Sequence, residues 1–167
     1  MADRRTQQQD SGSGEFEERV VNIKRCSKVV KGGRNFSFSA LVVVGNRAGK
    51  VGVGLGKANE VTDAIRKGGE MARKSLHHIP LNGTTITHEI RLKYRGADVM
   101  MRPAAPGTGL IAGGGMRAVL DLAGVRDVLA KSLGSSNPTN AVKATMQALQ
   151  NLHSRKEIME RRGVETL

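Results

Sequence analysis

The segment from Lys50 to Gly56 alternates glycine with larger aliphatic side chains, and this pattern constrains the fold more than any other feature of the chain. Its period of two residues predicts a β-strand with Val51, Val53 and Leu55 on one face and Gly52, Gly54 and Gly56 on the other. Glycine weakens a strand because it has no side chain to pack and loses more entropy when ordered. Something must therefore approach the glycine face closely, either another backbone or helix of the chain or a bulky ligand such as an RNA backbone. The sequence leaves both open.

The segments around this strand predict the rest of an N-terminal unit. Residues 16–30 and 35–44 are expected to form two further strands, the second half-buried with Phe36, Phe38, Ala40, Val42 and Val44 on its apolar face. The connections at 31–33 and 45–49 have the length of hairpin loops. A helix is expected over residues 60–76 with Asn59 as its N-cap. The predicted order is three strands followed by one helix.

The second half mixes strands and helices. Strands are expected over residues 84–95, 99–102 and 125–133, and a glycine-rich connection at 106–115 leads to a helix that ends at Gly124. Asn137 followed by Pro138 is typical of a helix start. Pro80 and the following Asn-Gly turn mark a domain boundary. We therefore predict an α+β protein with a flexible tail at 1–15, a first domain at 16–79, a second domain at 80–152 and a charged tail at 153–167.

The charge distribution points to a polyanionic partner. The formal net charge is +12 and the isoelectric point is about 10.6. Nine basic residues and no acidic residue lie in one continuous stretch, so we expect the contact surface in the first half. They are Arg19, Lys24, Arg25, Lys28, Lys31, Arg34, Arg47, Lys50 and Lys57. Aromatic residues make up only 2% of the chain, which argues against binding by base stacking and favours recognition of nucleic-acid backbone and shape.

Other functional classes find little support in the sequence. A single cysteine, Cys26, excludes an internal disulfide and a cysteine-rich metal site, and no apolar stretch is long enough to span a membrane. The run Gly107–Ala112 matches a dinucleotide-binding pattern, but the glycines after it are poor helix formers, which favours a connection at a protein contact. The four histidines lack ligand spacing, and no nucleophilic triad is identifiable. We predict a cytosolic non-enzymatic protein without cofactor, metal, membrane contact or small-molecule substrate.

Two long blocks of the sequence resemble a known family. They are VVKGGRNFSFSALVVVGNRAGKVGVGLGKANEV and GTGLIAGGGMRAVLDLAGVRDVLAKSLGSSNPTNAV, within a likeness that covers roughly residues 16–152. Both are similar to the family of the bacterial fifth protein of the small ribosomal subunit. The resemblance implies a first domain similar to a double-stranded-RNA-binding fold without its leading helix, followed by an α+β domain of the family's own second-domain type.

The resemblance also implies a role and partners. Family members bind small-subunit (16S-type) ribosomal RNA near the junction of head and body, contact the fourth and eighth proteins of that subunit, and influence decoding accuracy. The loop matching Ser27–Phe36 reaches toward an RNA helix of the head, and the stretch matching Gly107–Arg117 lies near the fourth protein. No bond is made or broken in this role, so the mechanism is positional.

These expectations select two sets of candidate residues. For RNA binding they are Lys24, Arg25, Lys28, Lys31, Gly32, Gly33, Arg34, Arg47, Lys50 and Lys57. For a protein interface they are Gly107, Thr108, Gly109, Gly113, Gly114 and Arg117. The alternative functions are a free-standing double-stranded-RNA-binding or annealing factor, and a nucleotide-dependent enzyme that uses the glycine-rich stretch at 107–115.

Overall fold

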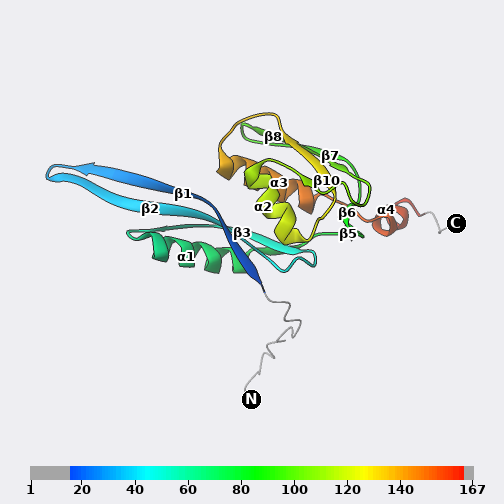
Figure 1. Ribbon diagram of the computed structural model, residues 1–167, viewed down its shortest axis with the longest axis horizontal. Coiled ribbons are helices and arrows are strands. Elements are labelled where there is room, and N and C mark those ends of the chain that lie inside the picture. Colours follow the sequence, from blue (N-terminus) through cyan, green and yellow to red (C-terminus); the bar gives the residue numbers. More distant parts are fainter. Residues whose placement is uncertain (1–15, 164–167) are drawn as a thin grey trace, which may run out of the picture.

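The computed structural model describes residues 16–163, so the predicted flexible tail at 1–15 and the last four residues of the charged tail lie outside the described residues. The first half is one antiparallel sheet with α1 (Val61–Lys74) across one face (Figure 1). Its strands, in spatial order, are β1 (Glu17–Val30), β2 (Gly33–Gly45), β3 (Lys50–Ala58) and β4 (Leu76–His78). The three predicted strands and the helix are confirmed. The short edge strand β4 was not predicted.

The glycine face of β3 packs directly against α1. A Cβ atom placed on Gly52, Gly54 or Gly56 would collide with the backbone of the helix. Gly68 is buried in α1 next to the Gly56 amide, so both elements present backbone to each other at this contact, whereas Gly69 faces the Glu18 side chain of β1. The close-packing interpretation is therefore confirmed, and an RNA approach to this face is wrong.

Strand β2 is buried on both faces in its second half, whereas the sequence predicted a half-buried strand. Ala40, Val42 and Val44 pack against α1 in a small core. Leu41 and Val43 belong to a larger core on the opposite face, which they share with Leu122 and other residues of the second half. The residue pattern shows the period of the strand, but the second face is buried only because another layer covers it.

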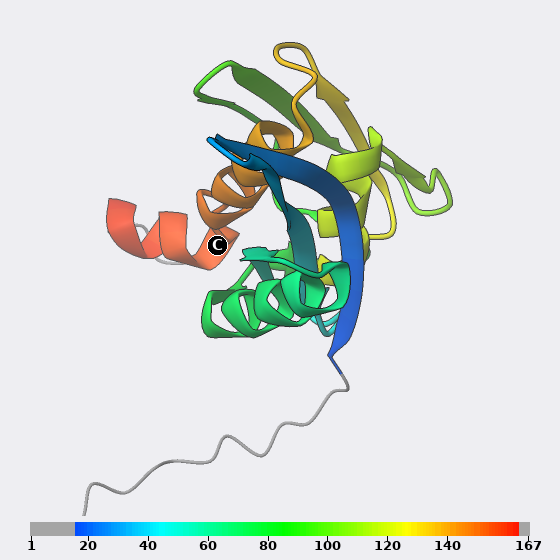
Figure 2. The ribbon, with the colours of Figure 1, turned by 90° about the vertical axis from the view of Figure 1, so that its left-hand side faces the viewer.

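The second half supplies that layer and a further sheet. The helices α2 (Gly114–Ala123) and α3 (Pro138–Gln150) lie between the first sheet and the second, on the side opposite α1 (Figures 1 and 2). The second sheet has the order β7-β8-β10-β9. Its strands are β7 (Ile90–Tyr94), β8 (Ala97–Pro103), β9 (Leu110–Ile111) and β10 (Val128–Ser132), and a separate small hairpin is formed by β5 (Leu81–Asn82) and β6 (Thr85–Ile86).

Several predictions for helix ends are confirmed. Gly124 ends α2 in the left-handed conformation with φ of 95°. The side chain of Asn137 accepts a hydrogen bond from the Thr139 amide at the start of α3. Asn59, by contrast, is not the cap of α1, because the helix begins one residue later and Glu60 occupies the cap position without a side-chain hydrogen bond.

Three segments of the second half differ from their predictions. The expected strand over 84–95 is interrupted at residues 87–89 and divides into β6 and β7. The connection at 106–115 contains β9, which pairs in parallel with β10. Within the predicted charged tail, α4 (Arg155–Arg162) is a helix that starts with a capping box formed by Ser154 and Glu157. None of the helices over residues 16–163 has the length and apolar character that a membrane crossing requires.

Candidate nucleic-acid interface

The hairpin of β1 and β2 projects well beyond the rest of the molecule (Figure 1). The two strands pair without interruption from Asn22 and Leu41 to Val30 and Gly33, and Lys31 and Gly32 form the turn. Every residue from 27 to 36 is exposed. A hairpin of only two strands has little stability alone in water, so a partner surface is expected to hold this distal part.

Cations occupy both faces of the projecting hairpin. Because directly paired residues share a face, the register places Lys24 and Lys28 on one face and Arg25 and Arg34 on the other. Lys31 lies in the turn. Exposed apolar side chains accompany them, with Val29 72% and Phe36 47% exposed. The hairpin therefore offers positive charge to phosphates on two sides, and its exposed Val29 and Phe36 add apolar contact on the face of Arg25 and Arg34.

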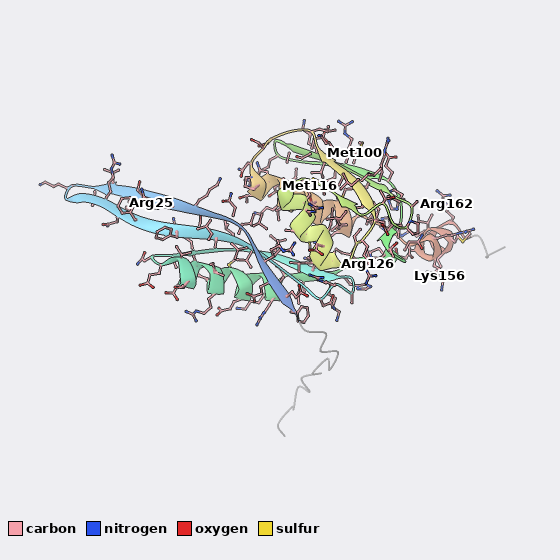
Figure 3. All side chains as sticks on the ribbon, in the orientation of Figure 1. Arg25, Met100, Met116, Arg126, Lys156 and Arg162 are labelled. Carbon is pink, nitrogen blue, oxygen red and sulfur yellow. The ribbon has the colours of Figure 1, made fainter. Side chains whose placement is uncertain are left out.

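Arg25 lies over the ring of Phe36, with 4.6 Å from the guanidinium carbon to the ring centroid. Both belong to the same face of the hairpin, and Figure 3 shows Arg25 on the projecting part. This cation–π contact holds the guanidinium along the ribbon without neutralising its charge. The sequence placed Phe36 on the apolar face of its strand, but α1 does not reach so far toward the tip, and the ring stays exposed.

The ten predicted RNA-binding residues do not form one cluster. Lys24, Arg25, Lys28, Lys31, Gly32, Gly33 and Arg34 lie together on the hairpin. Lys57 lies at its base, because Lys57, Ser39 and Lys24 are paired in one row across three strands. Arg47 and Lys50 lie at the β2–β3 connection, at the opposite end of the sheet.

Ion pairing separates these groups further. Arg47 donates to Glu17 at 2.8 Å, so a carboxylate already satisfies part of its charge. Among the described residues, by contrast, none of the five hairpin cations has an ion-pair partner. The five hairpin cations are therefore free to meet RNA phosphates, and so are Lys50 and Lys57, which also have no ion-pair partner among residues 16–163.

The predicted protein-interface residues form a second surface around the start of α2. Asp127, only 5% exposed, accepts hydrogen bonds from the amides of Gly107 at 3.0 Å and Gly109 at 2.9 Å. Both glycines have positive φ, at 91° and 80°, a conformation that other residues rarely adopt. The Thr108 hydroxyl donates to the Ala105 carbonyl at 2.7 Å. The loop is therefore held in one shape by its own hydrogen bonds.

The remaining interface residues continue this surface. Gly113 is the N-cap residue of α2 and Gly114 is the first residue of the helix. Arg117 donates to the Leu110 carbonyl at 3.0 Å, which ties α2 to β9. The dinucleotide-like run at 107–112 contains β9 and does not lead directly into a helix, so it lacks the loop-to-helix geometry that places a pyrophosphate.

Acid should release the 107–109 loop. Hydrogen bonds from the Gly109 amide, the Thr84 side chain and the Gly107 amide lower the pKa of Asp127, and burial only partly opposes this. A lowered pKa means that the carboxylate stabilises the fold above the ordinary aspartate pKa of about 3.9, and that this contribution is lost as the pH falls through the lower folded value. We expect the Gly107 and Gly109 amides to be protected from hydrogen exchange at neutral pH and to lose protection under acid conditions, as followed by NMR.

The variant Asp127→Ala should lose that protection at every pH. Asp121→Ala is the matched control. Asp121 lies on α2 and pairs with Arg19 of β1 at 2.7 Å, so it does not hold the loop. Equal protection of both glycine amides in the two variants would show that the carboxylate does not order the loop.

Comparison with known proteins agrees with the two-part α+β fold and with the basic hairpin. The family model described as ribosomal protein S5, N-terminal domain, matches residues 16–80, and the model for the S5 C-terminal domain matches residues 92–162. A small ribosomal subunit protein uS5 from Protochlamydia amoebophila is 58% identical over 157 residues, covering 94% of both chains.

Two further relatives are of similar likeness. The uS5 protein of Chlamydia trachomatis is 54% identical over 151 residues, covering 90% of this chain and 92% of the relative. That of Chloroflexus aurantiacus is 57% identical over 150 residues, covering 90% of this chain and 84% of the relative. Both family models and these relatives span most of the sequence, and the chain belongs to the ribosomal protein S5 family.

Proposed function

We propose that the β1–β2 hairpin of this small-subunit ribosomal protein inserts between elements of the small-subunit ribosomal RNA, and that the protein thereby stabilises the head relative to the body and contributes to translational accuracy. The observation that carries the proposal is the projecting hairpin, with unpaired cations on both of its faces. Family membership itself makes the chain a structural, RNA-binding component of the small ribosomal subunit.

The chemistry of the hairpin suits structured RNA. A-form RNA presents phosphates and a shallow minor groove, which Lys and Arg recognise by charge and geometry. The glycines of the turn add no side chain that would keep the backbone from phosphate oxygens, since a Cβ on Gly32 or Gly33 would meet nothing within 4 Å. Binding energy then holds RNA elements in place without any chemical step.

The second surface fits contact with neighbouring proteins. We assign it to the fourth protein of the subunit, with the eighth protein as a further neighbour. Ile111 is 54% exposed, and Leu129, its partner in the β9–β10 register, is 42% exposed, so an apolar patch adjoins the ordered loop at 107–109. A rigid loop beside exposed apolar side chains is typical of a protein interface.

An influence on accuracy requires that the subunit change conformation during decoding. A protein shifts such an equilibrium only if its contacts differ between the two states. The hairpin and the second surface lie on different parts of the molecule, so movement of RNA against a neighbouring protein would change one set of contacts while the other stays in place (Figure 1).

Sedimentation of a cell lysate tests the assignment. We expect the tagged chain to migrate with the small-subunit peak in a sucrose gradient, because its hairpin and its second surface are both engaged there. Nuclease treatment before centrifugation is the control and should move the protein toward the top. Migration near the top without nuclease would instead favour a free-standing RNA-binding or annealing factor.

A further inference from the structure

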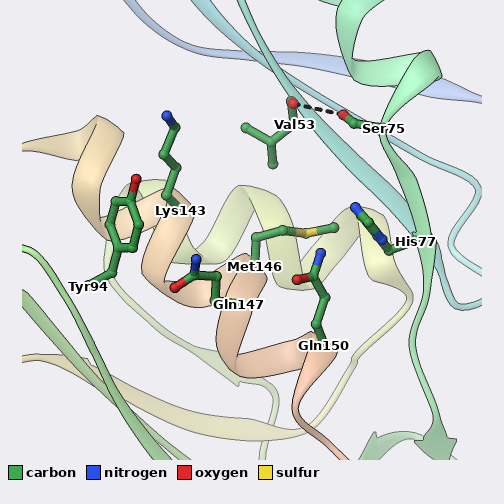
Figure 4. A pocket seen from close by; sticks show the side chains of 8 residues that line it. All are labelled: Val53, Ser75, His77, Tyr94, Lys143, Met146, Gln147 and Gln150. Carbon is green, nitrogen blue, oxygen red and sulfur yellow. Dashed lines mark hydrogen bonds between the residues drawn. The ribbon is translucent and has the colours of Figure 1, made fainter.

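A groove lies between the two halves of the protein, away from the hairpin and from the surface around α2. On one side it is bordered by β3 and β4 of the first sheet, and on the other by α3 and the end of β7 (Figure 4). Its volume is about 230 Å³. Typical pockets for drug-sized ligands are larger, roughly 300–1,000 Å³, so this one suits a single small planar group.

The groove combines an apolar floor with one aromatic ring. Val53 of β3 and Met146 of α3 face each other across it, and Met146 is only 7% exposed (Figure 4). Tyr94 borders the same space and packs on the core beneath. Arg95 lies over its ring, 5.6 Å from the centroid, which adds positive charge beside the aromatic wall. A flat, partly apolar ligand in the groove would make van der Waals contact with Val53, Met146 and the Tyr94 ring.

The Ser75 hydroxyl at the edge of the groove donates to the Val53 carbonyl at 3.0 Å, but four other polar side chains of the groove have no such partner (Figure 4). Lys143, Gln147 and Gln150 follow one another at helical spacing on α3, and His77 of β4 lies across from them. None of the four makes a side-chain hydrogen bond or ion pair within residues 16–163. The lining contains no acidic residue. These groups are therefore free to bind an anionic or neutral polar ligand.

The arrangement selects among ligand classes. A metal ion is disfavoured, because no group of three His, Cys, Asp or Glu residues is placed to hold one among the described residues. An acidic peptide would find only one lysine in the groove, and it would leave the two glutamine amides without a specific role. A nucleotide uses more of these features than either: the base contacts the apolar floor and Tyr94, the glutamine amides pair with its polar edge, and Lys143 meets the phosphate.

We propose that this groove binds one unpaired nucleotide extruded from RNA, with its base against Val53, Met146 and Tyr94 and its phosphate at Lys143. The inference rests on the proposed RNA-binding function and adds to it a second, base-contacting site. The low aromatic content excludes a platform that stacks several bases, but a single base needs a single ring. Unlike the hairpin, such a site discriminates single-stranded from double-stranded RNA.

Tyr94 allows a direct test, because it is the only tyrosine and the chain contains no tryptophan. Tyrosine fluorescence of the full-length protein is titrated with a short single-stranded RNA and with the blunt duplex that this strand forms with its complement. We expect a saturable change with the single strand and none with the duplex. Lys143→Ala should weaken the single-strand response about tenfold, and Gln147→Ala about fivefold.

The control variant is Lys131→Ala, which removes the same charge from an exposed position on β10 outside the groove. It should leave the response within about twofold of the parent protein. Equal responses to single strand and duplex, the same change with inorganic phosphate alone, or equal effects of Lys143→Ala and Lys131→Ala would each overturn the proposal. So would a saturable response to a polyglutamate peptide with none to RNA, which would assign the groove to a protein.

The two RNA proposals fail independently. A protein whose three hairpin cations Lys28, Lys31 and Arg34 are replaced by alanine keeps the groove intact, so its Tyr94 response to single-stranded RNA should remain. Failure of the unsubstituted protein to sediment with the small subunit would contradict the proposed function. An unresponsive Tyr94 in an unsubstituted protein that does sediment with the subunit would contradict only the groove.

Discussion

Gly54→Ala should lower the free energy of unfolding by about 3 kcal/mol, because the added methyl group has no space to occupy. A Cβ at this position would lie 2.6 Å from the amide nitrogen of Ala72 and still closer to the carbonyl of Gly68. Both groups belong to the backbone of α1, which cannot rotate away as a flexible side chain would. The helix must shift as a unit, and the small core of Ala40, Val42 and Val44 opens with it.

Urea unfolding of the full chain, followed by circular dichroism, measures this effect. Gly32→Ala is the matched control, since it makes the same substitution in the hairpin turn, where a Cβ would meet nothing within 4 Å. Its free energy of unfolding should change by no more than about 0.5 kcal/mol. Comparable losses for the two variants would show that the glycine face of β3 is not the tight contact described above.

The fold was predictable where local pattern and packing agree. Alternating residues located β2 and β3, and the bare face of β3 required a close neighbour, which α1 provides. Capping residues marked the end of α2 and the start of α3, because Gly124 and Asn137 act through their own backbone and side chain. Such signals are contained in a few adjacent residues, and tertiary context did not override them.

Features that depend on distant layers were not predictable. The second face of β2 is buried by residues from α2, which lie more than seventy positions later in the chain. The strand β9 consists of Leu110 and Ile111 alone and exists only because β10 pairs with it. The break at 87–89 leaves the alternation of residue types intact while the backbone bends. Periodicity carries no information about such long-range pairing.

The candidate interface was predictable in composition but not in shape. The acid-free stretch located the cations, yet only the register shows that Lys24, Lys28 and Lys57 share one face and that Arg25 and Arg34 occupy the other. The groove residues gave no signal at all, because His77, Tyr94 and Lys143 come from separate elements and meet only after the two halves pack.

Replacing Lys28, Lys31 and Arg34 together with alanine should weaken binding to small-subunit ribosomal RNA by about a hundredfold at moderate salt. All three side chains are exposed, so the loss acts on binding rather than on folding. Each lost phosphate contact also removes the release of a counterion. The slope of log Kd against log salt concentration should therefore flatten by roughly one unit or less per residue. Filter binding over a series of salt concentrations measures both quantities.

The control must remove the same charge from elsewhere, since any loss of three positive charges weakens nonspecific attraction to RNA. Lys67→Ala, Arg126→Ala and Lys131→Ala together meet this condition, because these exposed residues lie on α1, just before β10 and on β10, away from the hairpin. We expect the control protein to lose less than about fivefold in affinity. If the two triple variants instead show the same affinity and the same salt slope, the hairpin is no more than a part of a diffuse positive surface, because a specific contact must depend on where its charges lie.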